Sequence, residues 1–239
     1  MIVDLFIPCF IDQMYPQTGW STVKLLEHAG CQVEYNTKQT CCGQPLYNSG
    51  DLGHARKLAL KFINDFPHNR PIVTPSASCA AYIRKHYSRI LINDGLEAEA
   101  ERLKNNTWEL CDFLINILKV DNFNTTFNYT ITYHEACSAL REYGLKEEPY
   151  QLLKNVEGLQ LAEMPDKDEC CGFGGTFMVK FAGLSAAMSS QKVENALSTG
   201  AEYIVSTEAS CLMNIQSYIN KHKSPIKTIH IADLLASDL

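Results

Sequence analysis

The sequence predicts an α/β protein built from two homologous halves, each a Rossmann-like parallel sheet. Three observations predict this class. Short apolar runs of strand length alternate with helix-like stretches of about 10–15 residues, which is typical of parallel sheets. Eight of the ten cysteines fall into two sets with matching spacing. Short motifs repeat as well, because Ala77-Ser78-Cys79 and Ala209-Ser210-Cys211 each follow an apolar run.

The cysteine spacing defines the duplication. The first set is Cys9, Cys41, Cys42 and Cys79, and the second is Cys137, Cys170, Cys171 and Cys211. Partner cysteines are separated by 128, 129, 129 and 132 residues. Internal repeats of this kind indicate repeated structural units. We therefore expect a first domain over residues 1–122, a second over 129–239, and a polar linker at 123–128.

The two halves have the same order of expected elements. In the first half we expect a strand at 2–7, a helix at 18–29, a strand at 31–35, a helix from Leu52 and a strand at 71–74. In the second half we expect strands at 129–133 and 203–206, and a helix whose apolar face carries Leu184, Ala187 and Met188. Gly30 lies where a helix C-cap is expected, and the stretches after Cys79 and Cys211 are helical in character.

This arrangement places the cysteines just after the carboxyl ends of strands. Open α/β sheets bind their ligands at that edge. Cys79 and Cys211 would also lie near helix N-termini, where the helix dipole favours the thiolate.

Composition excludes several classes of partner and location. The formal net charge of −6 and the pI near 5.6 argue against nucleic acid or an anionic membrane as the main partner. No apolar run approaches the roughly 18 residues that span a bilayer. The N-terminal stretch has no signal-peptide pattern, so we expect a cytoplasmic protein. Because the cytosol keeps thiols reduced, the ten cysteines indicate metal binding or redox chemistry rather than disulfides.

Iron–sulfur clusters and zinc are the two candidates for thiolate-only sites. Each half contains an adjacent Cys-Cys-Gly, and neither contains the C-x₂₋₄-C knuckle of a zinc ribbon. Adjacent thiolates reach one ion with difficulty, whereas a cluster offers several irons. This favours iron–sulfur, with zinc as the alternative. Cys31 and Cys111 have no partner in the other half and are expected in the core, Cys31 within a strand and Cys111 within an apolar helical stretch from Trp108 to Leu118.

Three further features lie close to these motifs. His134 precedes Cys137 by three residues, and we expect it to support the ligands or to fill the core rather than to bind metal. Arg141 either brings a positive charge near an anionic cluster or substrate, or is an ordinary solvated arginine. The loop 172–177 lacks phosphate-loop spacing and is interpreted as the tight wall of the second site. No catalytic residue is assigned.

These motifs resemble the cysteine-rich (CCG) domain family. That family includes the iron–sulfur subunit of heterodisulfide reductases and the corresponding part of glycolate oxidase. The resemblance covers the whole chain and is strongest to a branch that acts in lactate utilisation. The residues that carry it are Cys41-Cys42-Gly43-Gln44-Pro45 with Asn48-Ser49-Gly50, Cys170-Cys171-Gly172-Phe173-Gly174-Gly175-Thr176-Phe177 and Ser210-Cys211-Leu212-Met213-Asn214-Ile215.

The resemblance implies that each quartet binds one iron–sulfur cluster, of [4Fe-4S] type. The fullest family members use five cysteines, and this chain has Ser76 and Glu208 where the fifth would be, so a cubane, a three-iron cluster and an oxygen-ligated variant all stay open. The implied function is electron transfer, as a non-catalytic or co-catalytic subunit with two partner subunits, in the oxidation of L-lactate to pyruvate. A reductase acting directly on a disulfide or on another 2-hydroxy-acid pathway substrate, and a structural zinc scaffold, are the alternatives.

Overall fold

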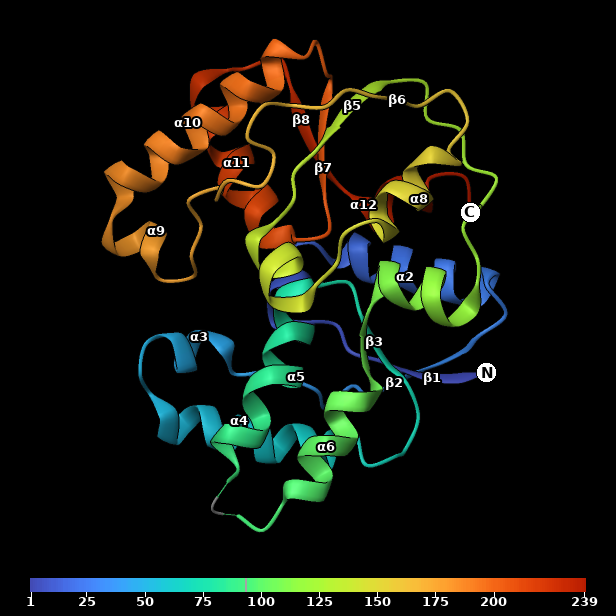
Figure 1. Cartoon of the computed structure of the whole chain (residues 1–239), viewed down its shortest axis with the longest axis vertical. Coiled ribbons are helices and arrows are strands. Elements are labelled where there is room, and N and C mark those ends of the chain that lie inside the picture. Colours follow the sequence, from blue (N-terminus) through green and yellow to red (C-terminus); the bar gives the residue numbers. More distant parts are fainter. Residues whose placement is uncertain (93) are drawn as a thin grey trace.

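The computed structural model describes residues 1–92 and 94–239 and contains two four-stranded parallel sheets (Figure 1). The first sheet has the order β2-β1-β3-β4, formed by β1 (Ile2–Leu5), β2 (Gln32–Tyr35), β3 (Ile72–Thr74) and β4 (Thr107–Glu109). The second has the order β6-β5-β7-β8, formed by β5 (Thr130–Tyr133), β6 (Gln160–Leu161), β7 (Tyr203–Ser206) and β8 (Lys227–His230). The identical strand order confirms the predicted fold class.

Helices connect successive strands in both halves. The first half contains α1 (Cys9–Met14), α2 (Pro16–His28), α3 (Gln44–Asn48), α4 (Leu52–Asp65), α5 (Ala77–Ile90), α6 (Glu97–Asn106), α7 (Leu110–Asp112) and the π-helix η1 (Phe113–Leu118). The second contains the π-helix η2 (Ser138–Tyr143), α8 (Glu148–Lys154), α9 (Phe177–Lys180), α10 (Ala182–Ser198), α11 (Ala209–His222) and α12 (Ile231–Leu235). Among the described residues, none of these helices is long and apolar enough to cross a membrane.

The fourth strand of each sheet was not predicted. The stretch from Trp108 to Leu118 was expected to be helical throughout, but it begins with the end of β4 and then forms two short helices. β4 is only three residues long and carries polar Thr107 and Glu109 on buried positions, so its sequence lacks the apolar pattern of a strand. Cys111 and Cys31 are buried, as predicted.

The predicted apolar face of α10 is wrong. Leu184 is 57% exposed and Ala187 is also exposed. The buried face instead carries Ser185, Ser189 and Lys192. The Ser189 hydroxyl donates a hydrogen bond to the Cys171 carbonyl at 3.0 Å, so these polar groups lie directly behind the second cysteine pair.

The stretch predicted as a linker packs against the second half. The Thr125 hydroxyl donates to the Leu235 carbonyl at 2.6 Å, and the Thr126 N–H donates to the Asp238 carboxylate at 2.7 Å. Phe123 is buried and contacts the His28 ring. The domain boundaries at 122 and 129 stay a prediction.

Each half packs its last helices against the other half. α2 lies against α12, and α7 and η1 lie against α8. The hydrogen bonds are reciprocal, because Thr18 donates to Asp233 at 2.7 Å and Tyr143 donates to Asp112 at 2.6 Å. One hydrophobic core contains side chains of both sheets and of these helices. The two halves therefore form one packed structure, in which the strand ends that carry the cysteines have fixed relative positions.

Glu109 ends β4 at this interface between the halves. Its side chain is fully buried, and one carboxylate oxygen caps α7 by accepting from the N–H groups of Cys111 at 2.7 Å and Asp112 at 3.1 Å. The other oxygen has no hydrogen-bond partner among the described residues. Burial raises the pKa of Glu109 to about 8, so the folded chain keeps this carboxyl protonated at neutral pH.

We expect the free energy of unfolding to fall as pH rises from about 5 to 8, with a slope approaching about 1.4 kcal/mol per pH unit from Glu109 alone. In that range the unfolded chain has lost the proton of Glu109 and the folded chain still binds it, so rising pH favours the unfolded state. Glu109→Gln keeps an oxygen to cap α7 but does not titrate. Urea unfolding of both proteins across this range measures the difference, and parallel pH profiles would contradict the assignment.

Candidate metal centres

The eight paired cysteines lie at the carboxyl ends of parallel strands, as predicted. In each half, one cysteine follows the first strand, the adjacent pair follows the second strand, and one lies in the first turn of the helix after the third strand. In that order they are Cys9, Cys41, Cys42 and Cys79 in the first half and Cys137, Cys170, Cys171 and Cys211 in the second. Because these strands are neighbours in each sheet, their ends bring four thiols of distant sequence position together.

Two sulfurs of the first quartet are in direct contact. Cys42 and Cys79 have their Sγ atoms 3.3 Å apart, and the Gly43 N–H donates to the Cys41 Sγ at 3.3 Å. Hydrogen bonds from the thiols of Cys42 and Cys9 lower the pKa of Cys41 to about 3. The same contacts, together with burial, raise the pKa values of Cys9 and Cys42. In this quartet the contacts thus favour the thiolate form of Cys41.

The second quartet repeats this pattern. The Gly172 N–H donates to the Cys170 Sγ at 3.4 Å. Hydrogen bonds from Cys137 and Cys171 lower the pKa of Cys170 to about 2, and they raise the pKa values of both donors. The two halves therefore agree in electrostatics as well as in sequence spacing.

Both quartets line one cavity of about 440 Å³ between the halves. Phe10 and Phe173 meet across it from opposite halves, with ring centroids 5.9 Å apart. Sequence reasoning expected one site in each half and did not predict that they share a cavity. The shared cavity results from the packing of the two halves against each other, which the cysteine spacing does not indicate.

The two positions that depart from the five-cysteine pattern contact each other. The Glu208 carboxylate is buried and accepts hydrogen bonds from the Ser76 hydroxyl at 3.1 Å, the Ser78 N–H at 2.9 Å and the Ser78 hydroxyl at 3.1 Å. Burial raises the pKa of Glu208, and the serine hydrogen bonds oppose that rise. Glu208 thus joins the first turn of α5 in one half to the start of α11 in the other. Nothing in the sequence indicated this contact.

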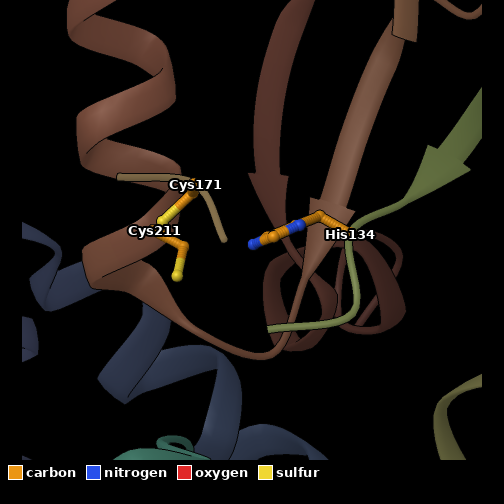
Figure 2. Close-up of side chains that lie close together, drawn as sticks. All are labelled: His134, Cys171 and Cys211. Atoms are coloured by element: carbon orange, nitrogen blue, oxygen red, sulfur yellow. The ribbon is translucent and has the colours of Figure 1, made fainter. Parts of the chain in front are cut away.

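His134 and Arg141 occupy different environments. His134 follows β5 and is fully buried, and its ring is directed toward Cys171 and Cys211 (Figure 2). Arg141 is mostly exposed and donates to the Asp168 carbonyl at 3.1 Å. It also lines a separate cavity of about 540 Å³ beside Cys170, together with Lys192. His134 is thus buried beside Cys171 and Cys211, whereas Arg141 lies near the surface, at the cavity that Cys170 also lines.

The chemistry of these residues fits a thiophilic metal group. Sulfur atoms dominate the donor set, and soft thiolates select iron–sulfur clusters or zinc. One thiolate in each half already has a lowered pKa, and metal binding would displace the protons of the other thiols. His134 adds a buried ring whose nitrogens have no hydrogen-bond partner in the described part of the chain.

The glycines after the cysteine pairs allow a matched test of the second site. Gly43 and Gly172 have positive φ angles of 97° and 87°, so alanine is strained at either position. At Gly172 an added Cβ would also lie 2.7 Å from the Ser185 carbonyl oxygen, whereas at Gly43 the nearest atom is at 3.4 Å. We expect Gly172→Ala to lower the free energy of unfolding by about 1–3 kcal/mol more than Gly43→Ala. Equal losses in urea unfolding would contradict the tighter packing of the second loop.

A solved structure with the same overall arrangement supports the fold. A hypothetical protein from Helicobacter pylori aligns with a TM-score of 0.58 at 10% sequence identity, over 99% of this chain and 48% of that chain. This chain therefore spans about half the length of that protein, and the likeness concerns the fold alone.

Sequence comparison identifies the family. Lactate utilization protein A of Geobacillus sp. (strain WCH70) is 41% identical over 238 residues, which is 99% of this chain and 100% of that protein. The protein of the same name from Bacillus subtilis (strain 168) is 40% identical over 238 residues, with the same coverage. The family described as the cysteine-rich domain, CCG, matches residues 3–84 and 131–216, which contain both quartets. The chain belongs to the cysteine-rich (CCG) domain family, with one such domain in each half.

Proposed function

We propose that this chain is the iron–sulfur electron-transfer subunit of a complex that oxidises L-lactate to pyruvate with two other subunits. The observation that carries the proposal is the pair of cysteine quartets that line one cavity. The similarity to proteins named lactate utilization protein A supports the assignment to lactate. The proposed ligands are Cys9, Cys41, Cys42 and Cys79 for the first centre and Cys137, Cys170, Cys171 and Cys211 for the second.

The chemistry of lactate oxidation agrees with two such centres. Conversion of the hydroxyl to a ketone removes an electron pair and two protons. An iron–sulfur cluster, when bound, exchanges single electrons. Two neighbouring centres can together take up the electron pair that leaves one lactate. This chain would bind the clusters, shield their inner sulfurs from water and keep them close to each other.

The chain's own residues would set the properties of these centres. The N–H groups of Gly43 and Gly172 donate to the first sulfur of each pair and stabilise its negative charge. Cys42 and Cys171 are each 2% exposed, so little water reaches the inner sulfurs. Hydrogen bonding and burial are two of the properties by which a protein tunes cluster potentials.

Direct action on a substrate is a second candidate, because the shared cavity is large enough for a small molecule. A structural zinc site is a third, because His134, Cys171 and Cys211 offer nitrogen and sulfur donors within 4.8 Å of one another. Iron–sulfur binding is favoured over zinc because both quartets contain adjacent cysteines, which suit a group with several metal atoms.

Metal and sulfide analysis of anaerobically prepared chain tests the ligand assignment. We expect iron with acid-labile sulfide in the wild type, and loss of about half of both in Cys42→Ser and in Cys171→Ser, since each removes one ligand set. Cys31→Ala is the matched control, because Cys31 is buried away from the quartets, and it should keep the full iron content. Unchanged iron in either serine variant would contradict the assignment for that half. Stoichiometric zinc without iron would support the scaffold.

Assays of the isolated chain separate electron transfer from catalysis. We expect purified chain with bound iron neither to oxidise lactate with a dye acceptor nor to reduce a disulfide, because its partner subunits supply the substrate site. Addition of the partner subunits should restore dye reduction by lactate. Turnover by the isolated chain would instead favour direct action at the shared cavity.

A further inference from the structure

The side chains that pack behind the cysteine pairs differ between the two halves at equivalent positions. The Phe6 N–H donates to the Val73 carbonyl at 2.9 Å, and the His134 N–H donates to the Val205 carbonyl at 2.8 Å. Both residues directly follow the first strand of their sheet and bond to the third strand. His134 is therefore the structural counterpart of Phe6.

A second pair of equivalent positions, also occupied by different residues in the two halves, lies next to the first. An added Cβ on Gly43 would contact Ala55 and Leu58, and one on Gly172 would contact Ser185 and Met188. These contacts align α4 with α10. Phe62 lies four residues after Leu58 and Lys192 four residues after Met188, so Lys192 is the counterpart of Phe62.

The first half fills this space with aromatic rings. Phe6 and Phe62 meet edge to face with centroids 4.9 Å apart, and Phe66 packs against both. The second half fills it with polar groups. Lys192 is buried and donates to the Asp166 carbonyl, and Asn214 donates to the Cys171 carbonyl at 2.9 Å. At the position of His134 the first half therefore has a ring without a donor atom. The polar atoms behind the first quartet are two hydroxyls: that of Tyr87, which donates to the Cys42 carbonyl at 2.8 Å, and that of Tyr82, which is buried without a partner among the described residues.

His134 is fully buried, yet neither ring nitrogen has a hydrogen-bond partner in the described part of the chain. A buried polar group left without a partner is destabilising. One ring nitrogen and the Sγ atoms of Cys171 and Cys211 all lie within 4.8 Å of one another. Figure 2 shows the ring directed into the space beside these two sulfurs.

The carboxylate that stands in place of a fifth cysteine ligand already has other hydrogen-bond partners. Glu208 occupies that position in the second half, and its oxygens accept hydrogen bonds from Ser76 and Ser78 of the first half. His134 is thus the buried donor beside the second quartet that has no other contact for its ring nitrogens among the described residues.

We propose that the His134 imidazole is a ligand of the metal centre in the second half, which makes that centre mixed sulfur–nitrogen, whereas the first half has the donor-free ring of Phe6 at this position. Imidazole nitrogen is a common ligand of iron and zinc. Where histidine replaces cysteine as a ligand of iron–sulfur clusters, the reduction potential rises. The second centre would then be the better electron acceptor of the two. This inference rests on the proposed function of the cysteines as cluster ligands.

Pulsed electron paramagnetic resonance on chain labelled with ¹⁵N-histidine tests the inference. Cys42→Ser removes the first centre and leaves the second, and Cys171→Ser does the reverse. We expect a strongly coupled nitrogen that changes with the label in Cys42→Ser and is missing in Cys171→Ser. His134→Phe in the Cys42→Ser background should abolish that coupling and lower the reduction potential. Phenylalanine is the residue of the first half at this position.

Each other outcome has a distinct meaning. Iron and sulfide without a strongly coupled nitrogen in Cys42→Ser would overturn the inference and leave the proposed function standing. A weak coupling alone would mean that His134 only donates a hydrogen bond to a ligand, which also overturns it. Chain without iron and sulfide would instead refute the proposed function. The label comparison in Cys42→Ser needs no change at His134, so it decides the question even where His134→Phe does not fold.

Discussion

The arrangement of the site depends on the buried carboxylate of Glu208. It lies at the N-terminus of α11 and accepts hydrogen bonds from two serines at the N-terminus of α5 in the other half. A buried charge or carboxyl without partners is costly, so this contact fixes how the two helices approach. Each of these helices carries the last cysteine of its quartet. This contact therefore joins the two helices that lead into the candidate centres.

Helices of each half also pack against the other half, and this packing further fixes the relative position of the halves. α12 of the second half covers α2 of the first, and α7 and η1 of the first cover α8 of the second. One hydrophobic cluster contains side chains of both sheets, and a second lies within the first half. The shared cavity is thus a consequence of the core packing rather than a separate feature.

The two halves share the four cysteines but differ in the residues that pack behind them. In both halves the first cysteine of the pair accepts from its glycine N–H and has a strongly lowered pKa. The residues behind the pair have diverged, from Phe6 and Phe62 to His134 and Lys192. If both quartets bind clusters as proposed, these different surroundings would give the two clusters different reduction potentials.

Much of this could be predicted from the sequence, and the remainder depended on contacts between distant residues. The strand alternation and the cysteine spacing predicted the two parallel sheets and the placement of each cysteine at a strand end. β4 was missed because Thr107 and Glu109 are polar yet buried. The buried face of α10 was missed because serines and a lysine, not leucines, face the core. The contact of Ser76 with Glu208 spans 132 residues, and no local pattern reports such a pairing.

Iron anomalous diffraction from crystals grown anaerobically tests the central claim most directly. The account predicts two groups of iron peaks, one beside Cys41 and Cys42 and one beside Cys170 and Cys171, both facing the same cavity. A single group of peaks, or peaks that appear only at the zinc absorption edge, would contradict it.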